Sequence, residues 1–414
     1  MATGVPSNLP KKITKIPVEL VYKGKKREEE VLNKDFCDFM NVGSVNGNNE
    51  ENKFFFGDNL DVLLYLLHNG YKNKIDLIYI DPPFATESLF LNRKQNNAYQ
   101  DLLSGGAFVE FLRERLIILR ELLSSRGSIY LHLDNNMAFV MKIIMDEVFH
   151  EKNCRAFITR KKCSTKNYTK NSFGNISDYI MFYSKTSKYT WNRPYDPWTS
   201  ENMIEQYPCI DEKTGRRFKK VPIHAPGVRK GETGKEWRGM LPPKGKHWQY
   251  TPEKLDEMDA SGEIYWSPTG NPRRKVYCDP DKGIPVQDIW LNYRDSVNQS
   301  LKTTGYPTEK NFDMLKMIIE SSSNKGDLIL DCFAGGGTTL GAAFDCGRRW
   351  IGADNSEESV KSILKRFKDG LDLYGDYVNT PKNKQLSLDY EKKCSFLVYT
   401  TESLQPKMKE LLRG

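Results

Sequence analysis

The chain of 414 residues carries 62 Lys and Arg against 54 Asp and Glu, a formal net charge of +8, and 38% of its residues are hydrophobic. This length exceeds what one hydrophobic core usually supports, so we expect two domains, or one large domain with an insertion. The sequence contains neither an apolar run of about 20 residues nor a signal-peptide core, which argues against a membrane protein and predicts a cytoplasmic location.

The eight cysteines include no C-x-x-C pair. Because zinc sites and dithiol redox sites usually need that spacing, we expect reduced thiols and no bound metal. Basic charge is concentrated at 155–250, where 20 Lys and Arg face 8 Asp and Glu and four tryptophans are interleaved. Such a composition suits phosphate contact and base stacking, although a solvated basic surface explains the charge equally well.

The first part of the chain reads as a polar extension followed by alternating strands and helices. Residues 1–50 hold a charged block and an Asn/Gly-rich run, which predicts an extension and a linker with a short helix near 28–38. Hydrophobic spacing then predicts strands at 54–56, 75–80, 128–133, 155–160 and 178–183, and helices at 60–67, 107–124 and 137–148. This alternation is typical of an α/β fold with a parallel sheet.

The four residues Asp81-Pro82-Pro83-Phe84 follow the predicted strand at 75–80. Neither proline can donate to a sheet ladder, so this strand must end at Asp81. Ligands bind open α/β sheets at the carboxyl ends of the strands, which makes the carboxylate, the following carbonyls and the Phe84 ring a candidate site. The same four residues are also compatible with a plain Pro-rich turn that begins with an acceptor side chain.

The stretch from about 187 to 299 is rich in Pro, Gly and Trp and has no sustained periodicity, which indicates an inserted domain of short strands and loops. Basic residues in its turns and just before it are candidate DNA contacts: Arg160, Lys161, Lys162, Arg216, Arg217, Arg229, Lys230, Arg273 and Arg274. Each of them alone is also explained by simple solvent exposure.

A second informative stretch follows the insertion. The pattern predicts a helix at 312–319, a strand at 327–331, a Gly-rich turn at 333–339, a helix at 340–346 and a strand at 349–353. Asp354 ends this unit, 19 residues after Gly335. Glycines let a ligand approach the backbone, and an acid at the second strand end can bond ribose hydroxyls. The stretch is therefore a candidate nucleoside-binding βαβ unit.

Together the two stretches resemble a known family. The residues at 81–84 resemble the catalytic motif of amino-methylating DNA methyltransferases, and residues 331–339, Asp-Cys-Phe-Ala-Gly-Gly-Gly-Thr-Thr, resemble their S-adenosylmethionine motif. The catalytic motif comes first and the basic insertion lies between the two. This order is similar to that of the β-group, which includes the modification subunits of type III systems and many type II enzymes. The resemblance covers roughly 54–185 and 300–370.

The resemblance implies a doubly wound Rossmann-like methyltransferase sheet with circularly permuted motif order and an inserted DNA-recognition domain. The chain then divides into an N-terminal extension at 1–50, catalytic parts at 51–186 and 300–372, a target-recognition domain at 187–299 and a C-terminal extension at 373–414. The implied partner is double-stranded DNA in a bacterial or phage-infected cell. A cognate restriction endonuclease and a second copy of the chain are further partners that such enzymes can have.

By the same resemblance, Asp58 contacts the cofactor adenine, and Thr308 and Lys310 lie in the segment that closes over its methionine end. The remaining cofactor contacts fall on the Gly-rich unit: Asp331, Phe333, Ala334, Gly335, Gly337, Thr338, Thr339 and Asp354. Two positions depart from the family pattern, since Cys332 stands where proline is frequent and Gly336 where serine is frequent. Neither position supplies a charged group, so cofactor binding is still expected.

The implied chemistry follows from the electronic structure of the target. An exocyclic amino nitrogen donates its lone pair into the base ring and is a poor nucleophile. The Asp81 carboxylate and the Pro82 carbonyl oxygen can each accept one N–H and aim the lone pair at the sulfonium methyl group. Phe84 can stack on the base after it has left the duplex. Transfer is then direct, with no covalent intermediate.

Several alternatives stay open at this point. Adenine N6 and cytosine N4 are both exocyclic amines, and Asp rather than Ser at position 81 favours adenine in this family. Cytosine C5 methylation is rejected because the Pro-Cys pair that it would need occurs only at 208–209, inside the insertion. A nicotinamide-dependent dehydrogenase would explain residues 335–354 and leave 81–84 unused. A catalytically silent DNA-recognition subunit would leave both motifs without chemistry.

Overall fold

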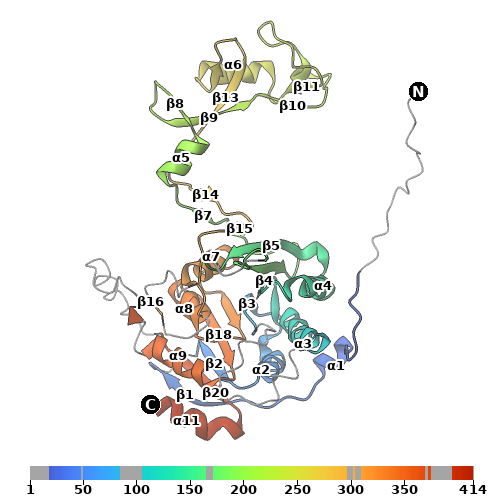
Figure 1. The fold of residues 1–414 in the computed structure, drawn as a ribbon, viewed down its shortest axis with the longest axis vertical. Coiled ribbons are helices and arrows are strands. Elements are labelled where there is room, and N and C mark those ends of the chain that lie inside the picture. Colours follow the sequence, from blue (N-terminus) through green and yellow to red (C-terminus); the bar gives the residue numbers. More distant parts are fainter. Residues whose placement is uncertain are drawn as a thin grey trace, which may run out of the picture. The chain divides into compact units, whose positions relative to one another are not determined.

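The computed structural model describes residues 18–47, 50–83, 105–164, 171–295, 302–303, 309–368, 372–373 and 394–413. The chain divides into two compact units (Figure 1). Unit 1 comprises Met1–Pro194 and Gln287–Gly414, and unit 2 comprises Tyr195–Val286.

The borders of unit 2 lie inside the predicted insertion at 187–299. Asn192 N donates to the Ser321 carbonyl oxygen at 2.7 Å, so the residues just before unit 2 belong to unit 1. β15 (Ile289–Trp290) pairs in parallel with β5 (Cys154–Lys161), which places the residues just after unit 2 in the large sheet. Unit 2 therefore covers only the central part of that stretch.

In the part of the chain that the structure describes, unit 1 contains one ten-stranded sheet. Its strands are, in order across the sheet, β1 (Met40–Val45), β20 (Phe396–Thr400), β2 (Lys53–Phe56), β18 (Arg349–Asp354), β17 (Leu328–Asp331), β3 (Ile75–Ile80), β4 (Leu123–Leu133), β6 (Ser177–Ser184), β5 and β15. All neighbours from β20 to β4 are parallel, whereas β6 runs antiparallel to both β4 and β5. The expected α/β, Rossmann-like sheet is confirmed, and every strand predicted for this unit is present.

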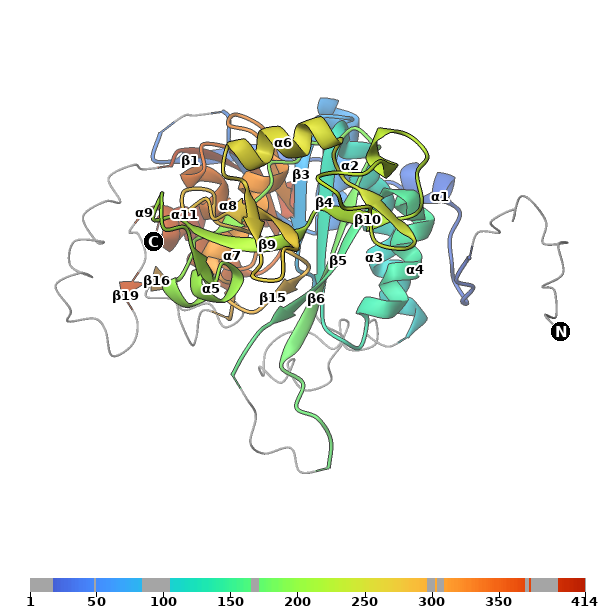
Figure 2. The same ribbon diagram turned by 90° about the horizontal axis from the view of Figure 1, so that it is seen from above.

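Helices cover both faces of this sheet (Figures 1 and 2). One face carries α2 (Asn59–Leu66), α3 (Gly106–Leu122) and α4 (Ala138–Phe149), and the other carries α7 (Phe312–Ser322), α8 (Thr338–Asp345) and α9 (Glu357–Lys368). At the periphery, α1 (Glu28–Leu32) packs against α3, and α11 (Gln405–Arg413) packs against β1. A small pair, β16 (Lys302–Thr303) with β19 (Asp372–Leu373), lies apart from the sheet.

The edge of the sheet is formed by two strands from the segments that the sequence suggests are extensions. β1 and β20 pair antiparallel, and β20 also pairs with β2. β1 has a polar sequence and mostly exposed or half-exposed side chains, so it carries no strong strand pattern of its own. Its strand conformation comes from pairing with a segment more than 300 residues away, which local periodicity cannot indicate.

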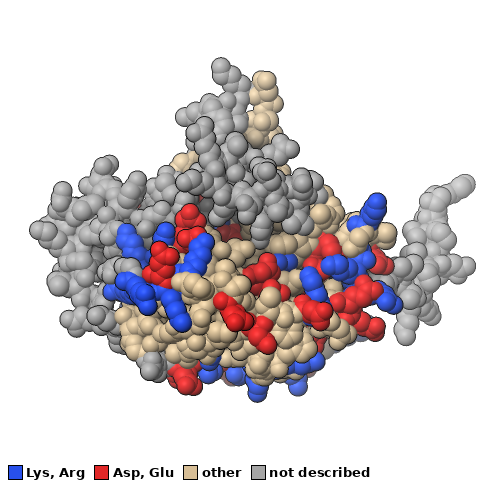
Figure 3. Space-filling model, turned by 90° about the horizontal axis from the view of Figure 1, so that it is seen from below, with Lys and Arg blue, Asp and Glu red and all other residues tan. Residues whose placement is uncertain are grey.

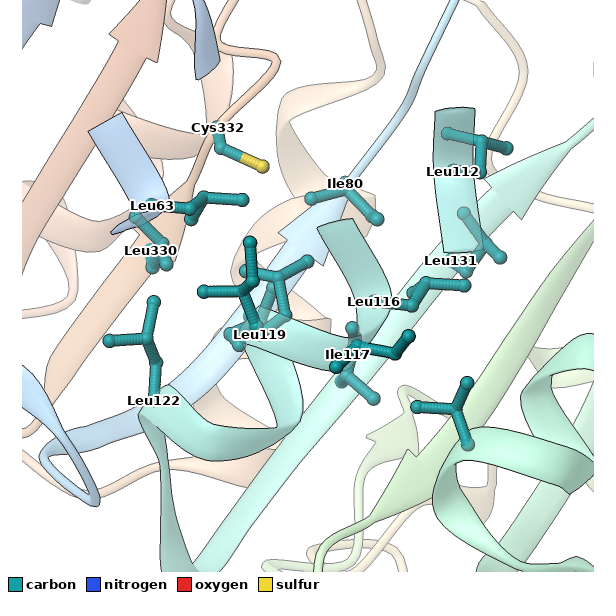
Figure 4. Close-up of a cluster of buried hydrophobic side chains, with 14 of the residues drawn as sticks. Leu63, Ile80, Leu112, Leu116, Ile117, Leu119, Leu122, Leu131, Leu330 and Cys332 are labelled. Carbon is teal, nitrogen blue, oxygen red and sulfur yellow. The ribbon is translucent and has the colours of Figure 1, made fainter. Parts of the chain in front are cut away.

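A continuous apolar core lies between the sheet and helices α2 and α3 (Figure 4). Leu63 of α2, Leu119 of α3 and Ile80 of β3 are all fully buried in it, together with Leu330 of β17. Burial of each such aliphatic side chain contributes roughly 1.5–3 kcal/mol. Because Ile80 and Leu330 directly precede Asp81 and Asp331, the same core fixes the strand ends that carry these two acids.

Unit 2 contains a four-stranded antiparallel sheet with its own small core. The sheet is formed, in order, by β12 (Ile264–Trp266), β13 (Pro272–Tyr277), β9 (Arg217–Pro222) and β8 (Cys209–Ile210). The unit also contains the helices α5 (Ser200–Gln206) and α6 (Pro252–Ala260). Two short antiparallel pairs complete it: β10 (His224–Pro226) with β11 (Lys246–Trp248), and β7 (Tyr195–Asp196) with β14 (Ile284–Pro285). The core comprises Ile223, Trp237, Trp248, Leu255, Met258 and Ile264. Several of the tryptophans therefore serve packing rather than base stacking.

The described surface of the molecule carries both signs of charge. On the face drawn in Figure 3, acidic and basic side chains of the described residues are interspersed. Among the helices that the structure describes, none has the length and apolar content that crossing a membrane requires.

Candidate active site

Four neighbouring parallel strands end at one edge of the large sheet, and each is followed or closed by an acidic residue. β2 leads to Asp58, β18 ends at Asp354, β17 ends at Asp331 and β3 leads to Asp81. β17 lies between β18 and β3, so the two sequence motifs, about 250 residues apart, meet at adjacent strand ends. This edge is the position at which open α/β sheets bind ligands.

The Gly-rich turn after β17 is held by the acid at the end of β18. Gly335 N donates to Asp354 Oδ2 and Ser356 N donates to Asp354 Oδ1, both at 2.9 Å. Asn355 N and the Ser359 hydroxyl also bond to Asp354, so four donors fix this carboxylate at the end of β18. Gly337 has φ +72°, and a Cβ there would lie 2.8 Å from Ile363 Cγ1. Only glycine fits this turn without displacing α9.

Asp331 is buried beneath the same turn. Its Oδ1 accepts from Phe333 N at 3.0 Å, and the Thr339 hydroxyl also bonds to it. Burial raises the pKa of Asp331 to about 7, and the nearby charges of Asp81 and Asp354 act in the same direction. A cationic ligand group placed here would favour the ionised carboxylate, so the residue fits the ammonium end of a methionine-containing cofactor.

Arg366 of α9 is a functional residue that the sequence reasoning missed. It is almost fully buried, donates from Nε to the Gly336 carbonyl oxygen at 2.9 Å, and bonds through Nη2 to Glu309 and, at 3.3 Å, to Thr338 Oγ1. One side chain thus joins the Gly-rich turn to the segment that carries Lys310. Arg366 lies within the apolar stripe of α9, and a cation at such a position could have indicated from the sequence that it has a buried partner.

Arg115 of α3 plays a similar part on the other side of the turn. It is buried, donates from Nε to Asn59 Oδ1 at 2.6 Å and lies 3.3 Å from Asp58 Oδ1. Asn59 in turn donates to the Cys332 carbonyl oxygen at 2.9 Å. Asp58 also caps α2 by accepting from Leu60 N at 2.8 Å. The predicted adenine contact is therefore held in place by its neighbours, with 43% of its side chain exposed.

Asp81 sits at the end of β3 with its two oxygens in different surroundings. Oδ2 lies 3.0 Å from Lys310 Nζ, and Oδ1 is buried and has no hydrogen-bond partner among the described residues. Pro82 is buried and Pro83 is half-buried. The structure therefore brings together Asp81, Lys310 and Asp331. The predicted site residues Phe84 and Thr308 lie outside the described residues.

One predicted DNA contact needs correction. Arg160 is fully buried and donates to Asp178 from Nε at 2.8 Å and from Nη2 at 2.6 Å, so it is a core residue and cannot reach DNA from the surface. Ile158 and Arg160 lie on the same buried face of β5, which the period of two in a strand could have indicated. Lys161 and Lys162, at the end of this strand, are half-buried.

In unit 2 the sheet places a set of basic and aromatic residues on one face. Across β9 and β13, Lys220 lies opposite Lys275 and Pro222 lies opposite Arg273. Tyr265 of β12 lies opposite Arg273 on the other side of β13. Residues that lie opposite each other in neighbouring strands point to the same face of the sheet, so these side chains share one face. Lys220 Nζ lies 3.7 Å from the Tyr265 ring centroid. We call Lys220, Tyr265, Arg273, Lys275 and Tyr277 the basic sheet face. Lys220 and Arg273 on it are exposed.

The other predicted basic residues of unit 2 divide into exposed and engaged ones. Arg216, Arg229 and Lys230 are exposed, and the Arg216 guanidinium lies 4.6 Å from the Tyr277 ring centroid. Arg274 points to the opposite side of the sheet and donates to Tyr250 Oη at 2.6 Å. Arg217 is half-buried and donates to the Tyr207 carbonyl oxygen at 3.4 Å.

The described part of the chain contains no group of three or more His, Cys, Asp or Glu side chains arranged to hold a metal ion. All eight cysteines are free thiols. The strand-end edge carries carboxylates, backbone groups, Lys310 and two buried arginines.

Comparison with known proteins gives consistent matches. A family model described as DNA methylase matches residues 75–365. The type II methyltransferase M.EcaI of Enterobacter cloacae is 50% identical over 375 residues, which are 90% of this chain and 82% of that protein. The Mod subunit of the type III restriction-modification enzyme StyLTI of Salmonella typhimurium is 29% identical over 333 residues, and the chain covers only 50% of its length. The solved M1.HpyAVI–SAM complex aligns with 76% of this chain and 98% of that one, at 14% identity and a TM-score of 0.42.

Proposed function

The chain belongs to the DNA methylase family, and from this premise we propose that it methylates the exocyclic N6 of adenine in duplex DNA, with S-adenosylmethionine as the methyl donor. The observation that carries the proposal is the adjacency of β3 and β17, which brings Asp81 and Pro82 beside the Gly-rich turn at Asp331. A base amine held by Asp81 and Pro82 would face a cofactor held by the Gly-rich turn.

The residues of the Gly-rich edge fit S-adenosylmethionine chemically. Asp331 suits the ammonium group, Asp354 lies at the strand end where the ribose is expected, and Asp58 is exposed enough to meet the edge of the cofactor adenine. Gly337 lets α9 pack closely against this turn, because a Cβ there would lie 2.8 Å from Ile363 Cγ1. When bound, the cofactor supplies an electrophilic methyl group on a sulfonium.

Asp81 and Pro82 then act on the target amine. The carboxylate and the Pro82 carbonyl oxygen each accept one N–H, which draws the nitrogen out of conjugation with the ring and frees its lone pair for attack. The proton leaves after the nitrogen has become cationic, so Asp81 acts chiefly by electrostatic stabilisation. The base must first leave the duplex, at a cost of a few kcal/mol.

The choice of adenine over cytosine rests on Asp at position 81, because the family resemblance associates Asp there with adenine and Ser with cytosine. Cytosine N4 is the second candidate target, since its exocyclic amine presents the same two N–H groups. The basic sheet face of unit 2 supports DNA as the substrate, because exposed cations interleaved with tyrosines can contact phosphates and bases. We place the enzyme in the cytoplasm, where its DNA substrate lies, with an endonuclease partner and homodimerisation as further proposals.

The decisive experiment incubates the protein with labelled S-adenosylmethionine and unmodified DNA, digests the DNA and identifies the labelled nucleoside. We expect N6-methyladenine. Labelled N4-methylcytosine would overturn the adenine assignment, and sequence-specific binding without any transfer would favour a silent recognition subunit. The variant Asp81→Ala should abolish transfer while binding S-adenosylmethionine almost normally. Loss of cofactor binding by this variant would contradict the role given to Asp81.

A further inference from the structure

A buried chain of polar side chains runs from the catalytic strand end into the antiparallel part of the sheet. Tyr79 of β3 bonds to His132 Nδ1 at 2.7 Å, and His132 Nε2 lies 2.9 Å from Asp178 Oδ2 on β6. Asp178 is held bidentately by Arg160, which also donates to Asp295 Oδ1 at 2.7 Å. Tyr79, His132, Asp178 and Arg160 are all essentially inaccessible to solvent. Neither the family motifs nor the mechanism above uses them.

The ionisation of this chain follows from its contacts. Burial alone would raise the pKa of Asp178, but His132 and Arg160 hold it well below its usual range, so Asp178 is a carboxylate. Burial lowers the pKa of His132, and the positive charge of Lys310 lowers it further, whereas the Asp178 and Asp81 carboxylates raise it. His132 is thus neutral. Because the Asp178 carboxylate can only accept, the ring proton resides on Nε2.

The second ring nitrogen is therefore an acceptor, and Tyr79 supplies its donor. Burial raises the pKa of Tyr79 well above its ordinary value, so the phenol keeps its proton and donates to Nδ1. Nδ1 also lies 3.9 Å from Asp81 Oδ1. A neutral ring with this tautomer has no N–H to offer to Asp81, whereas the other tautomer would direct one at it.

We infer that Tyr79, His132, Asp178 and Arg160 form a positioning chain that holds His132 as the Nε2–H tautomer, so that the inner oxygen of Asp81 stays an unshared acceptor for the target amine. This inference rests on the proposed role of Asp81. It accounts for the unpaired Asp81 Oδ1, because leaving a buried acceptor without a donor is unfavourable and the substrate N–H can supply that donor on binding. The four side chains are positioning residues.

The test uses Tyr79→Phe in the full-length protein, because it removes one hydroxyl and keeps the ring in place. Tyr130→Phe is the matched control: Tyr130 is similarly buried on the adjacent strand, and its hydroxyl bonds at the same 2.7 Å to Ser322 Oγ of α7 rather than to His132. We expect Tyr79→Phe to lower kcat about tenfold with KM for DNA and S-adenosylmethionine affinity within twofold. Tyr130→Phe should leave all three unchanged.

Three kinetic results would overturn the inference. They are an unchanged kcat in Tyr79→Phe, an equal loss in both tyrosine variants, and a loss that appears in KM alone. The nitrogen-15 spectrum of histidine-labelled protein gives an independent readout, with His132→Gln used to assign the signal. A neutral Nε2–H ring at pH 7 is expected, and an Nδ1–H or cationic ring would also overturn the inference. Failure of the proposed function is recognised separately, because the wild-type protein itself would then transfer no label to adenine N6.

Discussion

Lys310 Nζ lies 3.0 Å from Asp81 Oδ2, so the carboxylate that we propose to be catalytic pairs with a cation through one oxygen, while its other oxygen faces His132. The family resemblance assigns Lys310 to the segment over the methionine end of the cofactor. The structure also gives this lysine a direct contact with Asp81, the group that we propose binds the base. A charge-assisted contact of this length fixes the carboxylate orientation as well as its charge.

The first prediction concerns this pair. Lys310→Met should lower kcat about 10²-fold, the usual loss when one preorganised partner of a reacting group is removed, and should change the dissociation constant for S-adenosylmethionine less than threefold. Single-turnover methylation and equilibrium binding measure the two quantities. Lys316→Met is the control, because Lys316 pairs with Asp345 at 2.6 Å on the surface of α7. A fall in cofactor affinity as large as the fall in kcat would return Lys310 to the cofactor site.

The second prediction follows from Asp331, whose pKa is raised by burial to about 7. Below that pH the carboxyl is mostly protonated and cannot pair with a cation, so S-adenosylmethionine should bind more tightly as pH rises from 5 to 7, by up to about tenfold per unit, and level off above 7. Isothermal titration across this range measures the effect. Asp331→Asn should bind weakly and without this slope. A flat profile in the wild-type protein would place the cationic group elsewhere.

The same shift has a consequence for folding. A carboxyl whose pKa is higher in the folded than in the unfolded state binds its proton more tightly when folded. Its contribution to stability is therefore present at low pH and is lost as pH rises from about 4 towards 7. The free energy of unfolding of Asp331→Asn should decline less than that of the wild type over this interval.

The third prediction concerns Arg366, which joins Glu309 to the Gly336 carbonyl oxygen. Arg366→Leu removes one partner of a buried ion pair and should destabilise the protein by about 3–5 kcal/mol, because the buried Glu309 loses its arginine partner. Lys361→Leu, exposed on the same helix, should change stability by less than about 0.5 kcal/mol. Denaturant unfolding gives both values. The double variant Glu309→Gln/Arg366→Leu should recover part of the loss, and no recovery would mean that the arginine acts mainly through the turn.

The strands of the sheet were predictable where the pattern was local. β3 and β17 are short apolar runs, and each is followed directly by a turn, Asp-Pro-Pro after β3 and the Gly-rich turn after β17. The pattern that predicts each strand and its end therefore lies within about ten residues of sequence. β1 was not predictable, because its sequence is polar and its partner β20 lies more than 300 residues away. β20 is apolar, but nothing near it indicates a place in the sheet.

The candidate site shows the same division. Asp81, Asp331 and Asp354 are marked by the turns that follow them, so the motifs alone placed them at strand ends. The chain from His132 through Asp178 to Arg160 was not visible, because each partner comes from a different strand and acquires its role only through pairing. Arg160 was read as a surface cation because a run of basic residues follows it, and the alternation of β5 was the stronger signal.

The fourth prediction separates DNA contact from packing in unit 2. Arg273 is exposed on the basic sheet face, whereas its neighbour Arg274 points to the other side and donates to Tyr250 Oη. If the basic sheet face contacts phosphates, Arg273→Ala should weaken DNA binding and reduce the slope of log K against log salt by about 1. Arg274→Ala should leave that slope unchanged and lower the melting temperature instead, since it removes a half-buried hydrogen bond. Fluorescence anisotropy over a series of salt concentrations measures the slopes.

Equal slopes in the wild type and Arg273→Ala would mean that DNA does not contact the basic sheet face. The exposed Arg229 and Lys230 would then be the next pair to test.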